Sequence, residues 1–462
     1  MGTLFSSSRL PNQKRNQGSM HRRRKSKLQW VIFAMVGGFS SLGIADNLQQ
    51  LTQEALQQDP RVKSSEFELE IRKAQDDQAF GQVLPQVRAS STLTQNQRKL
   101  LGNAVDQDEE SDYTGERYTV SASQVLFNWE AFKNIERAGY QVSQSEWRMR
   151  DALATVILDS AERYIDVLSS ADNLALVKAE KETVENQLLQ FERLYEKGMV
   201  RITDLLDVQT KRDTIVADGI EAQGNLDIAK EAMAELTGRF VQDYAAFPDK
   251  FSLPVLDPEA DWVKASLANN LQLNALTDSL RAAEANYRRM KAGHLPTLDF
   301  QLSYSDSDIG FDNSATDGSQ TTVAALNINI PLYSGGTTSA RAREAFNQWQ
   351  MEKLEYERLS REVSKQAREA EVNARSSLER ITANQYRVNS AEKSYEAMNT
   401  SFKLGAVTVS DVVESLQQSY QAKRDLQFSR YNYLKSWLRL KYLSGELTLA
   451  TVEDINRLLN VN

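Results

Sequence analysis

The chain has 462 residues, and its 63 Asp and Glu residues outnumber its 55 Lys and Arg residues, which gives a formal net charge of −8 at pH 7. This acidic balance argues against a nucleic-acid partner, because binding to phosphates requires a basic face. The chain has no cysteine, which excludes disulfides. Its only two histidines are His21 and His294, and the first lies in an N-terminal segment that we expect to be removed, so the sequence argues strongly against a histidine-based metal site and a Ser-His-Asp triad. We therefore expect no catalytic residues, no cofactor site and no metal site.

The first predicted element is a cleaved secretory signal over residues 1–45. A basic cluster at 22–27 precedes an apolar run at 28–44, and the run ends in small residues at Ala45. This is the layout of a signal that is cut after Ala45, and Met20 is an alternative start to Met1. Glycines and serines dilute the apolar run, which disfavours a membrane anchor. Cleavage would remove eight basic residues and no acid, so the net charge would become −16.

The placement of the eight prolines predicts two very long helices. Residues 86–247 and 332–462 contain no proline and are rich in Ala, Glu, Gln, Leu, Lys and Arg, which favours helix. We expect helices at about 130–197 and 340–404, the first roughly 100 Å long. Helices of this length cannot bury themselves in an ordinary globule, so we expect them to pack lengthwise as a coiled coil.

Four shorter helices are predicted around the long ones. They cover about 51–83, 204–236, 262–294 and 411–443. One helix that precedes the strands and one that follows a long helix would together match the length of one long helix, if they stack end to end. We therefore expect two short helices, placed end to end, to occupy one helix position in a bundle of uniform length.

Four segments between the helices change to a hydrophobic period of two. They are QVRASSTLTQ (86–95), RYTVSASQVLF (117–127), LDFQLSY (298–304) and ALNINIP (325–331). Such two-faced strands of about ten residues fit either a half-buried soluble sheet or a membrane barrel. Taken alone, the alternation favours the soluble sheet, because alternating strands are commoner there.

An acidic, glycine-bearing segment lies between the members of each strand pair, at 101–116 and 305–320. Asp306 and Asp308 raise the alternative of a calcium site, but a spaced ligand loop with a closing glutamate is missing. Polar turn-forming residues dominate both segments, so we expect solvated hairpin tips.

The chain carries a tandem duplication. Residues 56–85 align without a gap on 267–296, and each copy ends in Leu-Pro. The turn YEKGMVRITDLLDVQ is repeated 207 positions later as FKLGAVTVSDVVESLQ. Gly198 aligns with Gly405, Asp204 with Asp411 and Asp207 with Glu414. A period this long does not fit a solenoid unit, so the copies are better read as two equivalent parts of one wall.

The duplication predicts the organisation of the mature chain. The first structural repeat covers 46–240 and the second covers 260–445, each with the order helix, hairpin, long helix, turn and helix. Residues 241–259 form the link between the repeats and 446–462 form the tail, and both are expected to wrap the bundle as a belt. Four strands cannot close a barrel within lipid, where an open edge leaves backbone groups unsatisfied. Three chains would supply twelve strands, which is a known barrel size.

In their order and spacing, these features resemble the TolC family of outer-membrane efflux ducts over residues 46 to about 445. The resemblance rests on the tandem halves, the two Leu-Pro pairs, the segment PLYSGG (331–336) and its relative VLFNW (125–129), the two turns and the late segment RYNYLKSWLRLKYLSGEL. It implies a mainly α homotrimer with a twelve-stranded transmembrane β-barrel, four strands per chain, in the outer membrane and its lipid. The barrel would continue into a long α-helical coiled-coil tunnel in the periplasm.

The resemblance also implies roles for the two turns, which lie at the closed periplasmic tip in that family. Asp411 and Glu414 match a carboxylate ring at the narrowest point, which would favour cations. The candidates for an entrance latch are Arg201, Asp204 and Asp207, and the candidates for tip turns that contact an adaptor are Gly198, Met199, Val200, Gly405, Ala406 and Val407. As an alternative, Thr408 and Asp411 resemble a capping box, and the capping and ring roles can coexist.

One departure from that family concerns the lock of the entrance. Where some members carry a tyrosine and an arginine, this chain has Phe402 and Val407, so the same hydrogen-bonded lock cannot form. Arg201 could replace it by pairing with Asp204 or with an acid of the neighbouring helix, or it could simply be solvated, since surface pairs contribute little.

The function expected from the resemblance is that of an exit duct. The chain would passively conduct substrates from an inner-membrane transporter of the ABC or RND type, through a periplasmic membrane-fusion adaptor, for drug efflux or type I protein secretion. A periplasmic coiled-coil scaffold is the alternative, although it would not explain four alternating strands. A general porin needs many strands and few long helices. The sequence does not identify the transporter or the cargo.

Overall fold

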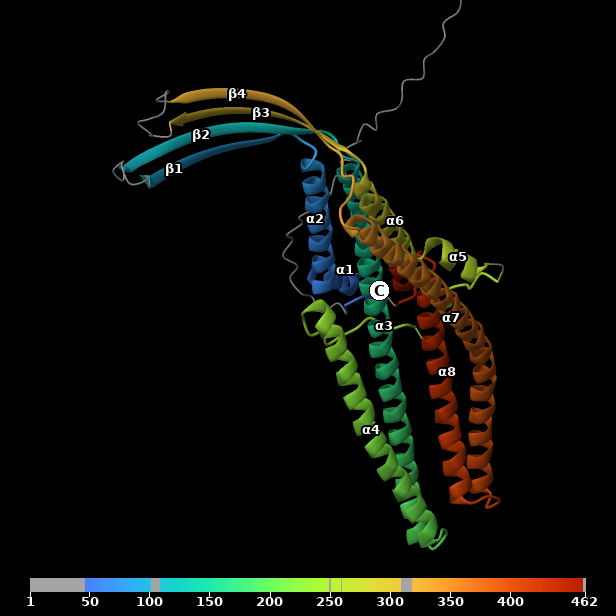
Figure 1. Cartoon of the computed structure of the whole chain (residues 1–462). Helices are drawn as coiled ribbons and strands as arrows, with labels where there is room; N and C mark the ends of the chain where they lie inside the picture. The colour runs from blue at the N-terminus through green and yellow to red at the C-terminus, as the bar shows by residue number, and fades with distance from the viewer. Residues whose placement is uncertain (1–45, 101–108, 249–250, 259, 309–317, 460–462) are drawn as a thin grey trace, which may run out of the picture. The chain divides into compact units, whose positions relative to one another are not determined.

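Long helices and one four-stranded sheet make up the chain in the computed structural model, which describes residues 46–100, 109–248, 251–258, 260–308 and 318–459 (Figure 1). The predicted signal at 1–45 lies outside the described residues. In chain order the elements are α1 (Leu48–Gln58), α2 (Pro60–Gly81), β1 (Gln86–Leu100), β2 (Glu109–Phe127), α3 (Trp129–Glu196), α4 (Ile202–Thr237), α5 (Trp262–Asn269), α6 (Leu271–Lys291), the short 3₁₀ helix η1 (Ala292–His294), β3 (Thr297–Asp308), β4 (Ser319–Asn329), α7 (Thr337–Lys403), α8 (Val409–Leu443) and α9 (Leu449–Asn456).

The two long helices confirm the prediction from proline placement. α3 has 68 residues and α7 has 67, and neither is interrupted. Asn128 starts α3, because its side-chain oxygen accepts a hydrogen bond from the amide of Ala131 at 3.1 Å. Gly139 lies inside α3 without breaking it.

The first short helix of each repeat is broken, whereas the sequence predicted one continuous helix in each place. Asp59 ends α1 and caps α2, accepting from the amide of Arg61 at 2.7 Å, and Pro60 occupies the first turn. Asn270 plays the same part between α5 and α6, accepting from the amides of Gln272 and Leu273 at 3.1 Å each. In both repeats an N-cap side chain restarts the helix, which lets the chain change direction there.

The short helices stack end to end beside the long ones, as predicted. α2 and α4 both pack on α3. Where the two short helices meet, a buried cluster of Ala55, Val62, Val156 and Leu236 connects them to α1 and α3. In the second repeat, α6 and α8 both pack on α7 and on α3. The side-chain amide of Asn270 donates to the carbonyl of Leu443 at 3.2 Å where these two helices meet. In Figure 1, α2 and α4 follow one another along α3.

The sheet is antiparallel throughout, in the order β1-β2-β3-β4. Representative partners are Val87 with Ala122, Val120 with Tyr304 and Leu298 with Ile328. β1 and β4 are the two edges of the sheet in this chain.

The strands extend into the segments that were predicted as loops. β1 and β2 have 15 and 19 residues instead of about ten, and β2 already begins at Glu109. β3 runs to Asp308 and β4 begins at Ser319, so both ends of the predicted second loop are strand. Antiparallel pairing satisfies the backbone whatever the side chain is, so polar residues continue a strand as long as its partner does.

The apolar side chains of the sheet are exposed in the single chain. Val87, Leu93, Leu326 and Ile328 are all more than half exposed. The half-buried soluble sheet that the alternation alone favoured is therefore wrong. Two-faced strands that no element of the described chain covers need another apolar medium on one face.

The link and the tail pack against the middle of the bundle. The hydroxyl of Tyr164 on α3 donates to the carbonyl of Ala245 in the link at 2.6 Å. The backbones of Asp46 and Tyr244 form an isolated parallel β-bridge. The tail contains α9, which packs on α1 and which the sequence did not predict. Val452 and Ile455 of α9 are fully buried, so this eight-residue helix is held by docking rather than by its own propensity.

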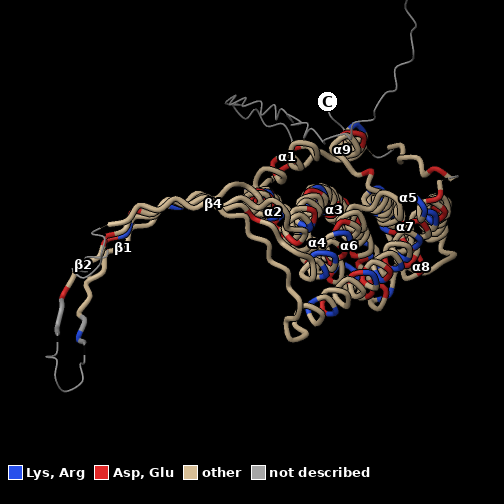
Figure 2. The backbone as a smooth tube through the Cα atoms, turned by 45° about the horizontal axis from the view of Figure 1, so that its top comes forward, with Lys and Arg blue, Asp and Glu red and all other residues tan. Residues whose placement is uncertain are grey.

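The helical surfaces carry charges of both signs. Figure 2 shows Lys and Arg interspersed with Asp and Glu along the helices. Arg358 of α7, for example, pairs with Glu355 and with Glu362 at 2.7 Å each. Among the described helices, none is both long enough and apolar enough to cross a membrane.

Candidate functional site

The two turns that close the long helical hairpins have the same backbone. Gly198 and Gly405 adopt φ angles of +68° and +75°, in the left-handed region that favours glycine. The amide of Met199 donates to the carbonyl of Leu194 at 2.9 Å, and that of Ala406 donates to Ser401 at 3.0 Å. These bonds satisfy the last carbonyls of α3 and α7, as in a Schellman motif, so the sequence duplication is a structural one at this point.

The second turn starts α8 with a reciprocal cap. The amide and the hydroxyl of Thr408 donate to Asp411 Oδ2 at 2.8 and 2.7 Å, and the amide of Asp411 donates back to Thr408 Oγ1 at 3.3 Å. These hydrogen bonds from the Thr408 hydroxyl and amide hold the pKa of the Asp411 carboxyl below its ordinary value. The capping box predicted from the sequence is confirmed.

The first turn starts α4 with an ion pair instead. Arg201 is the N-cap residue, and a guanidinium has no acceptor to offer the helix. Its amide donates to Asp204 Oδ2 at 3.2 Å, and its Nη2 lies 3.2 Å from Asp204 Oδ1. Of the predicted alternatives for Arg201, the structure shows the pair with Asp204, although the Arg201 side chain stays 74% exposed. Asp204 itself is buried.

Asp207 connects the two turns. Its Oδ2 accepts a hydrogen bond of 2.8 Å from the hydroxyl of Ser410 at the start of α8. This is a polar contact between the first hairpin and the second within one chain. Asp207 thus occupies a place suited to a latch, whereas Arg201 and Asp204 bind each other within the first turn.

An aromatic contact lies above the turns. The rings of Phe191 on α3 and Phe402 on α7 meet edge to face, with their centroids 5.2 Å apart. Phe402 therefore packs against the neighbouring hairpin through its ring, although it lacks the hydroxyl of a tyrosine. A groove of about 600 Å³ opens between the two turns. Its lining includes residues of both turns, namely Gly198, Met199, Val200, Arg201, Asp204, Gly405, Val407 and Thr408.

The two acids proposed for the ring share one exposed face of α8. Asp411 and Glu414 are one helical turn apart and both are exposed. Glu414 accepts from the side-chain amide of Gln418 at 3.4 Å. The hydrogen-bond partners of both carboxylates in the described chain are neutral, so neither negative charge is offset by an ion pair there.

Sequence reasoning missed three residues that bind the hairpins together. Ser410 and Phe191 carried no signal, because their partners lie 203 and 211 positions away in the chain. It also missed Glu180, a carboxylate buried between α3, α4 and α8. Glu180 lies among other charged residues of α3, and nothing in the local sequence distinguishes it from those that are exposed. Its burial therefore could not be predicted.

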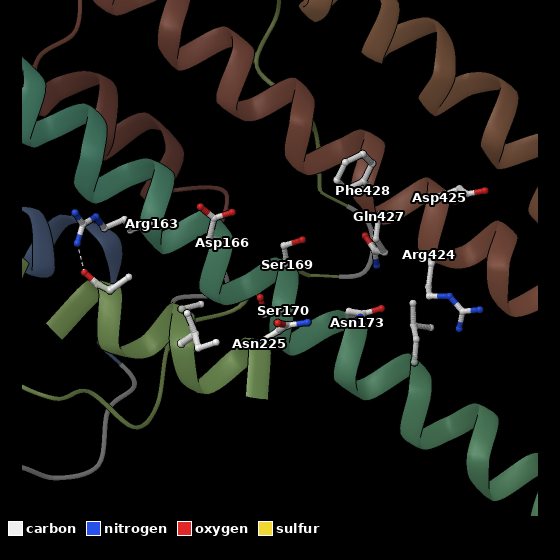
Figure 3. A pocket seen from close by; sticks show the side chains of 14 residues that line it. Arg163, Asp166, Ser169, Ser170, Asn173, Asn225, Arg424, Asp425, Gln427 and Phe428 are labelled. Carbon is white, nitrogen blue, oxygen red and sulfur yellow. Dashed lines mark hydrogen bonds between the residues drawn. The ribbon is translucent and has the colours of Figure 1, made fainter. Parts of the chain in front are cut away.

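A second groove, of about 640 Å³, lies among α3, α4 and α8 farther from the turns. Figure 3 shows its labelled side chains, with Arg163 and Asp166 near one end and Arg424 and Asp425 near the other. Its lining is mixed in charge, and Arg163 is paired with Glu235 at 2.8 Å. No group of three or more His, Asp or Glu residues in the described parts of the chain could hold a metal ion.

The chain matches the model of a known family over most of its length. The family is described as "Outer membrane efflux protein", and the match covers residues 51–239 and 262–446. The chain is 28% identical to the outer membrane protein TolC of Escherichia coli over 450 residues, which cover 94% of this chain and 90% of that protein. It is 27% identical to the alkaline protease secretion protein AprF of Pseudomonas aeruginosa, over 86% of this chain and 84% of that protein.

Solved structures give the same fold at lower identity. The CmeC outer membrane channel of Campylobacter jejuni superposes with a TM-score of 0.77 at 16% identity, over 90% of each chain. A crystal structure of CusC also gives a TM-score of 0.77, at 17% identity, over 88% of this chain and 95% of that one.

Proposed function

This chain belongs to the outer membrane efflux protein family, and from that premise we propose how its structure works as an exit duct. The chain is an outer-membrane duct for efflux or type I secretion, with its helical part in the periplasm. The relatives are channel proteins rather than enzymes, and we propose that this chain likewise has no catalytic activity.

The observation that carries the proposal concerns the two edges of the chain. At each edge the outer strand has no further strand beside it in the described chain, and the helices expose apolar side chains. β1 and β4 are the sheet edges, and α2 leads into β1 while α7 follows β4. Large apolar side chains are exposed on the helices at both edges: Phe67, Ile71 and Ile220 on α2 and α4, and Met351, Leu354, Val372 and Tyr386 on α7. Exposed apolar surface of this extent marks an interface.

A second copy that joins β1 to β4 would cover both edges at once. Such a contact is heterologous, and it closes into a ring when the rotation between copies fits. Three copies would make a twelve-stranded barrel, whose outward apolar side chains would face outer-membrane lipid. We therefore propose a homotrimer.

Detergent extraction followed by sizing tests the assembly. We expect the protein in the outer-membrane fraction as a trimer. A soluble monomer in the periplasmic fraction would contradict the duct and would support the alternative of a coiled-coil scaffold, which leaves the exposed sheet faces unexplained.

At the periplasmic end, three copies would bring six carboxylates together at one constriction. Each chain contributes Asp411 and Glu414, which share a face of α8 and have neutral partners. A ring of this kind concentrates cations and binds multivalent ones most strongly. The hydrogen bonds that lower the pKa of Asp411 favour its charged form, which suits this role.

Cation block of single-channel conductance in planar bilayers tests the ring. Asp411→Ala with Glu414→Ala is expected to weaken block by multivalent cations by about tenfold or more, since several charges per pore are lost. Asp218→Ala with Glu221→Ala is the matched control, because these acids have the same spacing on an exposed face of α4. Unchanged block in the first variant would confine Asp411 and Glu414 to helix capping.

We propose that the tip turns meet a periplasmic membrane-fusion adaptor that links the duct to an inner-membrane transporter. The contact would involve Gly198, Met199, Val200, Gly405, Ala406 and Val407. Met199, and Leu404 directly before Gly405, are among the exposed large apolar side chains of the described chain, which makes this surface suited to a partner. The name of AprF concerns protease secretion and that of BepC of Brucella suis concerns efflux, which supports keeping both proposed uses of the duct. The transporter would be of the ABC or the RND type.

A photo-crosslinking residue in place of Met199 tests the adaptor contact. An adduct with a membrane-fusion protein is expected in cells, and the same residue in place of exposed Phe67, far from the turns in sequence, should give none. Adducts only with other copies of this chain would contradict the adaptor contact.

The two repeats of each chain would form the wall of the duct. Residues 46–240 and 260–445 would be two equivalent wall segments per chain. The link at 241–259 and the tail at 446–462 would form the belt, which is supported by the contacts of Ala245 with α3 and of α9 with α1.

A further inference from the structure

A buried ion cluster joins three helices above the tip. Glu180 of α3 is only 3% exposed, and its Oε2 accepts a hydrogen bond of 2.7 Å from Arg424 of α8. Its Oε1 faces Lys211 Nζ of α4 at 3.5 Å and makes no hydrogen bond. The cluster therefore ties the first hairpin to the second by charge, in a place with little access to water.

Below this cluster the described residues of the two hairpins form no ion pair with each other, and the hairpins are joined by apolar packing, such as that of Phe191 on Phe402, and by neutral or exposed hydrogen bonds. Thr183 and Tyr420 share a hydrogen bond of 3.0 Å, and the amide of Gln187 donates to the hydroxyl of Tyr395 at 3.1 Å. At the tip, exposed Ser410 donates to exposed Asp207. Gln187 is buried but uncharged, and the other groups are neutral or exposed, so parting the hairpins here leaves no buried charge without its partner.

The contacts above the cluster hold α8 firmly. Tyr431 of α8 is buried and donates to Asp172 of α3, and Tyr442 donates to Asp151 of α3 at 2.9 Å. Burial and the neighbouring Asp151 raise the pKa of Tyr442 to about 12, so this hydroxyl remains a donor at neutral pH. Tyr433 of α8 also donates to the carbonyl of Pro254 in the link.

We propose that the Glu180 cluster is the pivot about which the entrance of the duct opens, an inference that rests on the proposed function. Separating Arg424 from Glu180 would leave a buried carboxylate with its hydrogen bond lost, which is far costlier than breaking the neutral bonds below. The hairpins therefore part from the tip up to Glu180 and stay joined above it. Glu180 lies 16 residues from the end of α3, so the moving part is roughly 25 Å long.

Single spin labels in the full-length trimer test the pivot, because the chain has no native cysteine to remove. One cysteine is placed at exposed Leu404 at the tip, or at exposed Phe428 one turn above Arg424, and distances between copies are measured in liposomes. Asp207→Ala with Phe402→Ala removes the hydrogen bond at the tip and the aromatic contact below the cluster. We expect longer and broader distances at Leu404, with those at Phe428 unchanged.

Glu180→Gln is then added to the double variant. We expect the distances at Phe428 to lengthen as well, because the glutamine carries no charge to hold Arg424. Asp166→Asn is the matched control, since it removes an exposed ion pair between α3 and α8, with Lys435, and should change neither distance. If Glu180→Gln does not assemble, Arg424→Gln is used in its place.

Two results would overturn the pivot. The first is that the distances between labels at Phe428 lengthen in the double variant while Glu180 is intact. The second is that these distances stay the same after Glu180→Gln is added. Failure of the proposed function is distinguishable from both, because it would show as the absence of a trimer and of conductance in the unmodified chain.

Discussion

The first tip turn at 197–201 and the second at 404–408 have the same backbone but different side-chain partners. In the second, Thr408 and Asp411 cap α8 reciprocally, and both remain exposed. In the first, the cap position holds Arg201, and Asp204 is buried against it. The glycines that form the turns were kept, while the side chains diverged. Within the described part of the chain, Asp411 and Glu414 after the second turn are exposed and have no positive partner, whereas Asp204 after the first turn pairs with Arg201.

The same divergence is found at the other ends of the short helices. Gly238 ends α4 and Gly445 follows α8, with φ angles of +73° and +70°. A Cβ on Gly238 would meet open space, whereas a Cβ on Gly445 would lie 2.5 Å from the carbonyl oxygen of Asn269. In the second copy the main chain of α5 therefore lies directly against the glycine after α8, whereas the end of α4 packs through Leu236 in a cluster with Ala55 of α1 and leaves Gly238 clear.

The largest difference between the copies is expected for these two glycines. Gly445→Ala should destabilise the fold by about 3 kcal/mol, since it combines the left-handed backbone with a clash against main chain. Gly238→Ala should cost about 1 kcal/mol, from the backbone alone. Thermal unfolding of the two variants measures the gap. Equal losses would mean that the contact with Asn269 relaxes freely.

A smaller difference is expected for the aromatic residues before the turns. Phe402 packs on Phe191, whereas its counterpart Tyr195 is exposed. Phe402→Ala should cost about 2 kcal/mol of local stability near the tip, from lost burial and the ring contact, and Tyr195→Ala about 0.3 kcal/mol. Amide hydrogen exchange over the last two turns of α3 and α7 reports both values. Similar protection in the two variants would show that the aromatic contact does not hold the hairpins.

The caps should differ by less again. Thr408→Ala removes the reciprocal cap of α8 and should cost about 1 kcal/mol in exchange at its first turn. Arg201→Ala should cost less than about 0.5 kcal/mol at the start of α4, because the guanidinium is mostly in solvent. A larger loss for Arg201 than for Thr408 would reverse the ranking of the two caps.

The smallest effect is a dependence on pH at the cap of the second turn. The pKa of Asp411 is lowered from its ordinary value of 3.8, so its charged form stabilises the folded turn. This stabilisation is complete above about pH 4 and is lost as the pH falls through the lowered pKa. A spin label at Leu404 should become more mobile over that acidic range, and Thr408→Val should reduce the change, because it removes the hydroxyl donor and keeps the amide donor to Asp411. Mobility that follows pH equally in Thr408→Val would assign it to another group.

Much of this fold could be predicted from local patterns. The long helices follow from stretches without proline, and the four strands follow from a period of two. The glycines and acids of both turns are within one helical turn of the caps they form, so Thr408 with Asp411 could be identified from the sequence alone. Pro60 after Asp59 also indicates a helix start within 51–83, a break that hydrophobic periodicity by itself does not reveal.

Contacts between distant parts of the chain were decided only by the tertiary structure. Ser410 binds Asp207, and Arg424 binds Glu180 across 244 positions. Whether such a pair meets depends on the rotation and register of two packed helices, to which the residues near each partner in sequence give no clue. The same holds for the docked helix α9 and for strands extended by their partners. The sequence by itself determined the helices, strands and turns, because these depend on neighbours along the chain. Packing decided which charges were buried, and with them where the two hairpins are joined.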